Sequence, residues 1–317
     1  MTQRSVSFVC PAYNERESLP ELIRELHELG KTLGVPYEIL IVDDGSTDGT
    51  RALLHNIADT DRSVHPVVLR RNSGKATALY AGFQRARGEL IVTLDADLQN
   101  DPGEVPKLLA AMTEQDVDIV TGWKFDRPDS LEKRLPSKLF NFVTRKLSGL
   151  QLHDFNSGIK LYTREAAQAL ELYGELHRYI PILAASQGFH IAEVQTHTRE
   201  RKYGETKYRG KRYFRGFFDL LTVFFLTKYN RRPLHLFGGI GLTVGGIGTI
   251  LLVYLAFIKI VGHQAIGTRP MLTFAIFFTL VGLQLVVTGL LAELLVRGMA
   301  HRQPPIRSEW NGDGPLA

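Results

Sequence analysis

Two aspartates one residue apart, Asp95 and Asp97, follow the apolar run 90–94. If that run is a buried strand, both carboxylates can turn toward one hard cation at its end. Oxygen ligands suit Mg²⁺ or Mn²⁺, and such a cation would offset the charge of a departing diphosphate. Gln99, two residues further on, adds a neutral oxygen. The alternative interpretation is a solvated turn, which the preceding apolar run makes less favourable.

A second acidic cluster, residues 43–49 (DDGSTDG), follows another strand candidate. From Asp44 the spacing is close to that of a calcium loop, but His55 stands where the closing glutamate belongs, and no helix precedes the motif. The cluster is therefore interpreted as a nucleotide site, in which Asp43 or Asp44 accepts hydrogen bonds from a base or ribose. Gly45 and Gly49 would allow the tight backbone.

The first strand candidate closes with residues 11–15 (PAYNE). This segment is predicted to present Tyr13 and Glu15 to a base and ribose. The alternative is a strand-to-helix turn in which Asn14 or Ser18 caps the next helix.

The elements that must position these clusters alternate between strand-like and helix-like patterns. Strands are predicted at 6–9, 38–42, 65–69, 89–94 and 118–121, and helices at 18–33, 50–58, 75–87 and 105–112. This order predicts an α/β fold with a mainly parallel sheet flanked by helices. Both acidic clusters fall at the carboxyl edge of that sheet, where such folds bind ligands.

Two apolar stretches, at 234–258 and about 271–295, are each long enough to cross a bilayer, which takes roughly 20 residues. The glycines between 238 and 248 predict close packing of the two helices. The segments outside the pair contain more basic residues than the short loop between the two stretches. The positive-inside rule therefore predicts that both outer flanks are in the cytosol. The alternative is a buried helical hairpin of a soluble protein, but no comparable soluble core surrounds it.

The formal net charge of +5 comes largely from residues 201–232, where ten residues are Lys or Arg. A basic segment before an apolar span suggests an anionic membrane face, and no nucleic-acid-binding module is recognisable. The segments 130–150 and 211–229 are basic and amphipathic, which indicates either interfacial helices or ordinary core helices. Cys10 is the only cysteine, which fits a reducing compartment. No N-terminal apolar stretch is long enough for a signal peptide, so a cytosolic catalytic part is expected.

Four motifs in order, PAYNE, DDGSTDGT, NSGKATAL and LDADLQ, resemble those of inverting glycosyltransferases of family two, which have the GT-A fold. The later segments 122–127, 154–158, 177–181 and 201–208 are similar to the polyprenyl-phosphate branch of that family. Arg232-Pro233-Leu234 before two spans resembles bacterial bactoprenol glucosyltransferases, with dolichol-phosphate mannose synthases as relatives in mechanism. The resemblance extends to about Met299.

The resemblance implies metal-dependent, inverting transfer of a hexose from a nucleotide-sugar, with UDP-glucose expected first, to undecaprenyl or another polyisoprenyl phosphate. The lipid-linked product would be a sugar donor for cell-envelope glycosylation. A GDP-mannose-dependent synthase is the nearest alternative, and a non-catalytic membrane scaffold is a further one. The resemblance also implies a homo-oligomer, for which a tetramer is expected.

The same resemblance implies roles for individual residues. The metal would be held by Asp95, Asp97 and Gln99. The catalytic and acceptor-phosphate group would comprise Asp154, Arg127, Arg134 and Ser137. The nucleotide-sugar site would comprise Pro11, Tyr13, Glu15, Asp43, Asp44, Lys75, Asp95, Ala96, Asp97, Arg201, Thr206 and Lys207.

Several of these roles have alternatives. Asp154 either orients the acceptor or the sugar, or it holds the turn at 155–158. Arg127 and Arg134 contact either the acceptor phosphate or anionic headgroups, and Arg178 with its neighbour His177 is either a site residue or the partner of a carboxylate. A lipid phosphate is already anionic at neutral pH, so no strong general base is required.

The predicted organisation has four parts: a cytosolic GT-A catalytic domain at 1–210, a juxtamembrane amphipathic segment at 211–232, two transmembrane helices within 233–298, and a cytosolic tail at 299–317. The expected location is the inner or plasma membrane, as a multi-pass protein with both termini in the cytosol.

Overall fold

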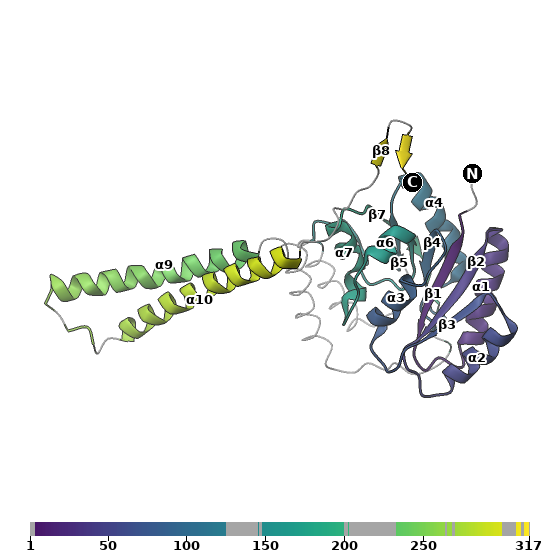
Figure 1. Ribbon diagram of the computed structural model, residues 1–317, viewed down its shortest axis with the longest axis horizontal. Coiled ribbons are helices and arrows are strands. Elements are labelled where there is room, and N and C mark those ends of the chain that lie inside the picture. The colour runs from purple at the N-terminus through teal and green to yellow at the C-terminus, as the bar shows by residue number, and fades with distance from the viewer. Residues whose placement is uncertain are drawn as a thin grey trace. The chain divides into compact units, whose positions relative to one another are not determined.

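The computed structural model describes residues 4–124, 145, 148–199, 202, 233–263, 265–267, 270–299, 309–311 and 314–316. The chain divides into two compact units, Met1–Val223 and Phe224–Ala317 (Figure 1). The first unit is an α/β domain, and the second contains two long apolar helices.

The first unit alternates strands and helices, as the sequence predicts. Its strands are β1 (Val6–Ala12), β2 (Tyr37–Asp43), β3 (Val64–Val68), β4 (Leu90–Thr93), β5 (Ile119–Lys124), β6 (Lys160–Thr163) and β7 (Ile191–Thr196). Its helices are α1 (Leu19–Leu33), α2 (Thr50–Thr60), α3 (Lys75–Phe83), η1 (Pro102–Glu104), α4 (Val105–Gln115), α6 (Arg164–Ala169), η2 (Leu176–Tyr179) and α7 (Ile180–Ser186).

The seven strands form one sheet in the order β3-β2-β1-β4-β6-β5-β7. All pairs are parallel except those of β6, which runs antiparallel to β4 and β5. The predicted mainly parallel sheet is therefore confirmed. Because β6 is reversed, its first residue, Lys160, lies beside the last residue of β4, Thr93, at the edge where the parallel strands end.

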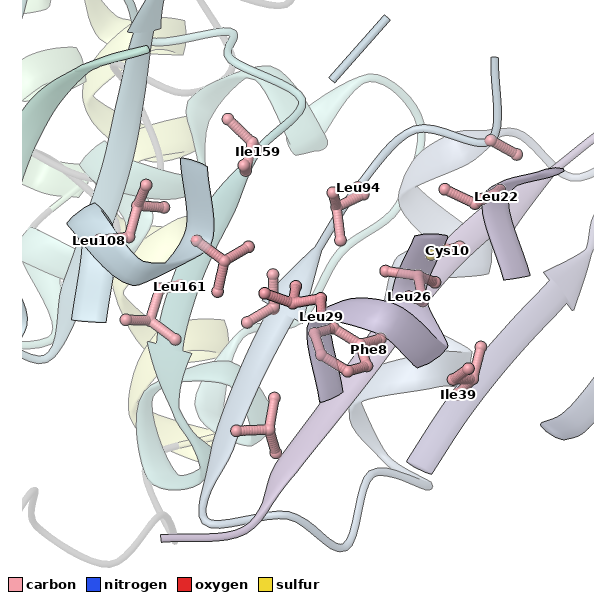
Figure 2. Packing of buried hydrophobic residues seen from close by; sticks show 14 of the residues in the cluster. Phe8, Cys10, Leu22, Leu26, Leu29, Ile39, Leu94, Leu108, Ile159 and Leu161 are labelled. Atoms are coloured by element: carbon pink, nitrogen blue, oxygen red, sulfur yellow. The ribbon is translucent and has the colours of Figure 1, made fainter. Parts of the chain in front are cut away.

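One face of the sheet is covered by α1, α2 and α4. Figure 2 shows Leu22, Leu26 and Leu29 of α1 above Phe8 and Cys10 of β1. These α1 positions recur every three or four residues, so a single face of the helix is buried, as its pattern predicts. The thiol of Cys10 belongs to this core, and burial raises its pKa.

The opposite face packs against α3, α6 and α7. Its largest fully buried side chains include Phe83, Phe155, Tyr162 and Tyr179. The rings of Phe83 and Tyr162 lie 5.1 Å apart, so α3 is packed directly onto β6. This face carries the start of α3, and with it Lys75, to the carboxyl edge of the sheet.

The strand order reverses between β1 and β4. From β1 the chain moves outward through β2 to β3, and then α3 carries it back to β4 on the other side of β1. Open α/β sheets bind ligands at such a switch point, beyond the carboxyl ends of the strands. The PAYNE segment spans the end of β1 and the loop after it, and the Asp95–Asp97 pair follows β4, so both lie at this point.

The second unit contains α9 (Pro233–Ile260) and α10 (Pro270–Met299), which lie side by side (Figure 1). The segments Pro233–Ile260 and Pro270–Val296 are long and apolar enough to cross a membrane. A Cβ at Gly241 would lie 2.7 Å from the carbonyl oxygen of Gly282, and one at Gly248 would lie 2.5 Å from the amide nitrogen of Thr279. The predicted glycine-mediated packing is therefore confirmed.

Glu293 lies near the end of α10, where its carboxylate accepts a hydrogen bond from the amide of Leu234 (3.2 Å). A carboxylate at a helix N-terminus is favourable, because the first amides lack helical partners. This contact ties the end of α10 to the start of α9. A short antiparallel pair, β8 (Glu309–Asn311) and β9 (Gly314–Leu316), follows in the tail.

Candidate active site

The loop after β1 is joined to the loop after β2 by hydrogen bonds. The amide of Asn14 donates to the hydroxyl of Ser46 (2.8 Å), and the amide of Thr47 donates to the side chain of Asn14 (2.8 Å). The amide of Glu15 donates to Thr50 Oγ1 (3.2 Å). Asn14 has a φ of 54°, a left-handed conformation that asparagine tolerates better than most residues. The two loops therefore form one framework.

This framework carries Pro11, Tyr13 and Glu15, all of which are partly exposed. The carboxylate of Glu15 accepts a hydrogen bond from the hydroxyl of Ser18 (2.9 Å). Ser18 occupies the position before α1, but its side chain does not cap the helix. The turn interpretation based on a Ser18 cap is therefore wrong, and the predicted nucleoside residues stay together at the switch point.

Asp43, the last residue of β2, is fully buried. Its Oδ1 accepts a hydrogen bond from the amide of Ser46 (2.9 Å). Its Oδ2 has no hydrogen-bond partner among the described residues, and Nε of Arg51 is 4.0 Å away from it. A buried carboxylate oxygen without a donor is costly. This oxygen is therefore suited to accept a hydrogen bond from a bound ligand.

Asp44 has a different environment from its neighbour. Its two carboxylate oxygens accept hydrogen bonds from the amides of Ser73 (2.7 Å) and Gly74 (2.9 Å). Burial raises the pKa of Asp44, while these two hydrogen bonds oppose that shift. Gly45 has a φ of 72°, and a Cβ there would meet the backbone of Arg71 at 2.5 Å. Asp44 therefore ties the end of β2 to the turn that precedes α3.

The Asp95–Asn100 segment alternates in exposure. Asp95, Asp97 and Gln99 are partly exposed, whereas the intervening residues Ala96, Leu98 and Asn100 are buried. The three predicted metal ligands are thus all accessible to solvent. Leu98 has a φ of 60°, which is strained for a leucine, and strained backbone of this kind is concentrated at functional sites. The amide of Gln99 donates to Asp97 Oδ1 (3.2 Å), which closes the turn.

The first residue of α3, Lys75, forms an ion pair with Oδ1 of Asp95. Lys75 also lines a narrow cavity together with Thr93, Lys160 and His177. Burial lowers the pKa of His177 to about 2, and the nearby charge of Lys75 adds to this shift, so the imidazole is neutral. The NSGKATAL motif is therefore joined to the LDADLQ motif through Lys75 and Asp95.

The donor set fits a small divalent cation. No group of three His, Cys, Asp or Glu side chains with metal-binding geometry occurs in the described part of the chain. Mg²⁺ and Mn²⁺ sites commonly use one or two carboxylates and complete their coordination with water and substrate phosphates. Asp95 and Asp97, with Gln99, would hold the cation, which when bound would neutralise charge on a diphosphate.

Asp154 is 3% exposed and is held by its surroundings. Its amide donates to the carboxylate of Glu193 (2.8 Å), and its Oδ1 accepts from the amide of Asn156 (3.1 Å). The adjacent His153 donates to Glu193 through its amide and is stacked on Trp123, with ring centroids 4.1 Å apart. The hydrogen bond from Asn156 to Asp154 Oδ1 supports the interpretation that Asp154 holds the turn. Both interpretations place it in the loop that precedes β6.

Six predicted site residues lie outside the described residues. They are Arg127, Arg134, Ser137, Arg201, Thr206 and Lys207. Both basic segments, 130–150 and 211–229, also lie wholly or mostly outside, so their predicted interfacial role stays a prediction. Arg178 has the carboxylate partner that one of its two interpretations predicts, because its Nη2 lies 2.7 Å from Oε2 of Glu175.

Two described neighbours of Arg201 are anchored to α1. Arg199 forms ion pairs with Glu25 and Asp101, each at 2.8 Å. Lys202 pairs with Glu21, also at 2.8 Å. The amide of Arg199 further donates to the carbonyl of Gln99 (3.0 Å).

Three residues near the site were not predicted from the sequence. Asn100 is buried, and its side-chain nitrogen has no hydrogen-bond partner among the described residues. Lys160 and Glu193 hold the two ends of the loop 153–160. Asn100 directly follows Gln99, so its position next to the LDADLQ motif was the one signal in the sequence. The other two belong to β6 and β7, which the sequence pattern did not reveal.

Comparison with known proteins agrees with this geometry. Residues 7–170 match the family "Glycosyl transferase family 2". The dodecaprenyl-phosphate galacturonate synthase of Rhizobium johnstonii is 35% identical over 296 residues, covering 92% of this chain and 88% of the relative. The undecaprenyl-phosphate 4-deoxy-4-formamido-L-arabinose transferase of Pseudomonas fluorescens is 38% identical, covering 92% and 84%.

Solved structures agree in fold. Glucosyl-3-phosphoglycerate synthase from Mycobacterium tuberculosis, in complex with Mn²⁺, UDP-glucose and phosphoglyceric acid, has a TM-score of 0.56 and 23% sequence identity. The match covers 72% of this chain and 82% of the other. The predicted GT-A fold is therefore confirmed. On the family match and these relatives, the chain belongs to glycosyl transferase family 2 and is a glycosyltransferase.

Proposed function

We propose that this enzyme transfers a sugar from a nucleotide-sugar to a polyprenyl phosphate at the membrane surface, with the help of Mg²⁺ or Mn²⁺. The observation that carries the proposal is the extent of the match to the two relatives named above. The match covers 92% of the chain, so it extends beyond the α/β unit into the unit that contains the two apolar helices. Both relatives are named for a polyprenyl phosphate.

The donor half of the site supports a nucleotide-sugar. Asp43 offers an unpartnered buried oxygen beside the framework that carries Tyr13 and Glu15, which is suited to a base or ribose. Asp95 and Asp97 lie at the same sheet edge, where a cation between them and a diphosphate would stabilise the leaving group. Lys75 adds a positive charge next to Asp95.

The acceptor half rests on the residues that the resemblance supplies. Arg127, Arg134 and Ser137 would receive the acceptor phosphate, and Arg201, Thr206 and Lys207 would hold donor or lipid phosphates. An anionic phosphate oxygen attacks the anomeric carbon as the bond from that carbon to the nucleoside diphosphate breaks. Direct displacement inverts the configuration. Cationic side chains are needed because two anions must approach each other.

The apolar hairpin supports the membrane location. Its two spans are separated by a loop of about ten residues. By the positive-inside rule, the basic residues before α9 and after α10 favour a topology in which both flanks are in the cytosol. The reaction would then occur at the cytosolic face of the inner or plasma membrane, where a polyprenyl phosphate presents its head group.

The relatives' names bear on which sugar is transferred. The sugars proposed for transfer are therefore glucose, galacturonate and 4-deoxy-4-formamido-L-arabinose. In each case the proposed donor is the UDP-sugar. Trp123 of β5 is stacked on His153. We propose that this stack contributes to the choice of sugar.

A panel of radiolabelled nucleotide-sugars tests the proposal. Purified full-length enzyme would be incubated with MnCl₂ or MgCl₂, undecaprenyl or dodecaprenyl phosphate, and one donor. The donors would be UDP-glucose, UDP-galacturonate, UDP-4-deoxy-4-formamido-L-arabinose and GDP-mannose. Label in the lipid extract that depends on both polyprenyl phosphate and metal is expected with one UDP-sugar. Transfer only from GDP-mannose would contradict the donor assignment, and lipid labelling without any metal would contradict the cation's role.

Asp97→Asn tests the metal site at the level of one residue. Removing one carboxylate charge is expected to lower transfer by about 100-fold or more, because mutation even of the residues that orient metal ligands typically costs about 10- to 100-fold. The thermal unfolding midpoint should stay near that of the wild type, since Asp97 is partly exposed. Normal transfer by the purified variant would remove Asp97 from the site.

A further inference from the structure

The backbone of Gly158 is packed directly against the carboxylate of Asp95. A Cβ at Gly158 would lie 2.9 Å from Cγ of Asp95 and still closer to its Oδ2. The same position lies 2.7 Å from Nδ2 of the buried Asn100. Side-chain carbons do not approach other atoms this closely, so only glycine fits. Asp95 is thus held on one side by Gly158 and on the other by Lys75, which pairs with Oδ1.

Gly158 belongs to the loop 153–160, and Glu193 of β7 holds the start of this loop. The Glu193 carboxylate accepts hydrogen bonds from the amides of His153 (2.9 Å) and Asp154 (2.8 Å), and it lies 2.8 Å from Nδ1 of His153. The Glu193 side chain is only 9% exposed. Hydrogen bonds to an ionised, largely buried acceptor are stronger than neutral ones. The start of the loop is therefore tied to β7 by the Glu193 side chain.

Lys160 holds the other end of the loop. It is the first residue of β6, is 3% exposed, and its Nζ donates to the carbonyl oxygen of Ser157. Its backbone is in register with Thr93 of β4 and Thr121 of β5. Burying an ammonium group is expensive unless its hydrogen bonds are satisfied locally. The buried Lys160 binds Ser157, the residue directly before Gly158, and so fixes the backbone conformation at Gly158.

We propose that Glu193 and Lys160 are positioning residues that hold the loop 153–160 against Asp95, and so set the orientation in which Asp95 meets the divalent cation. The inference rests on the proposed function, because it concerns the carboxylate that would bind that cation. Neither residue touches substrate in this role. Both act through the backbone of Gly158, which limits the rotation of the Asp95 side chain.

Three variants separate the anchoring of the loop 153–160 from its contact with Asp95. Glu193→Gln weakens the anchor at the start of the loop while keeping its size, and Lys160→Met removes the cation at the end. Gly158→Ala leaves both anchors in place and pushes on Asp95 directly. Glu114→Gln, on the exposed face of α4, is the matched control for the first. Gly239→Ala is the control for the third, because a Cβ there meets nothing within 4 Å.

Binding of Mn²⁺ is the decisive measurement. Free Mn²⁺ would be followed by its EPR signal as MnCl₂ is added to purified full-length protein in the presence of UDP. For Glu193→Gln, Lys160→Met and Gly158→Ala the dissociation constant of Mn²⁺ is expected to rise about 10- to 100-fold, as for other residues that orient metal ligands. Both controls should bind Mn²⁺ like the wild type. Lys160→Arg, which keeps the positive charge, should recover part of the affinity lost in Lys160→Met.

The outcomes also separate this inference from the proposed function. If the wild type binds Mn²⁺ and the folded variants bind it equally well, the positioning role is wrong while the proposed function stands. If the wild type binds no Mn²⁺ and Mg²⁺ does not support transfer either, the positioning role and the cation's part in the proposed function are both wrong. If Glu193→Gln does not fold, Gly158→Ala decides the question, because it alters the contact with Asp95 and leaves Glu193 in place.

Discussion

At the scale of single residues, Asp43 combines complete burial with an oxygen that no described group donates to. The amide of Ser46 fixes Oδ1, so in Asp43→Asn the amide group is expected to point Oδ1 toward Ser46 and place NH₂ where Oδ2 was. An acceptor becomes a donor at that point. A ligand N–H or O–H then faces another donor instead of a carboxylate.

We therefore expect Asp43→Asn to raise the KM for the nucleotide-sugar by about 10-fold or more, since a lost hydrogen bond to a charged group costs about 1.5–3 kcal/mol. The KM for the polyprenyl phosphate should change little. Steady-state kinetics with each substrate varied in turn would measure both. An increase confined to the lipid substrate would mean that Asp43 does not hold the nucleoside.

The sequence predicted the residues whose signal is local. Asp95 and Asp97 follow one apolar run, and Gly45 and Gly49 stand where the backbone has positive φ. Glu193 and Lys160 could not be found in the same way. The partner of Glu193, Asp154, is 39 residues away in the sequence, and the partner of Lys160, Ser157, lies in a turn that no sequence pattern predicts. Neither has a type or spacing that differs from ordinary surface residues. Their burial appears only after the sheet is assembled.

At the scale of elements, α3 is packed closely enough on the sheet to set the position of Lys75. A Cβ at Gly82 would collide with Val9 of β1 and lie 3.2 Å from Cγ2 of Val42 of β2. Any larger residue would push α3 outward and draw Lys75 away from Asp95.

Gly82→Ala is therefore expected to lower the free energy of unfolding by about 1–3 kcal/mol, which is typical of overpacking. Val9→Ala provides the missing space, so the double variant should lose less stability than the sum of the two single variants. Chemical denaturation of the three proteins would measure this coupling. Strict additivity would show that α3 does not depend on this contact.

A hydrogen-bonded group of His27, Tyr37 and Asp61 lies at the start of β2, at the opposite end of that strand from the site. His27 lies 2.6 Å from Asp61 and 2.9 Å from the hydroxyl of Tyr37. Burial raises the pKa of Asp61, but hydrogen bonds from Ser63 and His27 outweigh it, so the net shift is downward from 3.8. A carboxyl whose pKa is lower in the folded state stabilises the protein above its unfolded pKa and loses that contribution as the pH falls.

Asp61→Asn is accordingly expected to unfold at a lower temperature than the wild type at pH 7. The difference should shrink as the pH falls from about 4, where the carboxyl of the unfolded chain becomes protonated, toward the lower pKa of the folded wild type. Thermal unfolding at a series of pH values would test this. A gap between the two proteins that stays constant down to pH 3 would exclude a contribution from ionised Asp61.

The predicted elements agree with the structure where the apolar pattern is strong. The helix predicted at 18–33 is observed at Leu19–Leu33, and the strand predicted at 38–42 at Tyr37–Asp43. The helix predicted at 75–87 ends earlier, at Phe83, because the amides of Arg85 and Ala86 both turn back to the carbonyl of Gly82. The four-residue strand β6 is too short for an alternating pattern to be visible.

At the scale of the whole molecule, the two spans are predicted to be the main membrane anchor. Deleting residues 234–317 removes both helices and leaves the α/β unit intact, so the truncated protein should move largely to the soluble fraction. Centrifugation of cell lysates followed by immunodetection would measure this. If the truncated protein still sedimented completely with membranes, the basic segment 201–232 would have to be the stronger anchor.

The reversed strand β6 has a consequence for how members of this family diversify. Lys124 ends β5 and Lys160 begins β6, and the two strands pair beside each other, so both ends of the intervening stretch meet at the same rim of the sheet. Changes in the length or composition of residues 125–144 would therefore leave the register of β5 and β6 unchanged, because both strands are fixed by their own pairing. Exchanging only these residues between relatives, with the loop 153–160 kept, is thus a route to hybrid enzymes on an unchanged sheet.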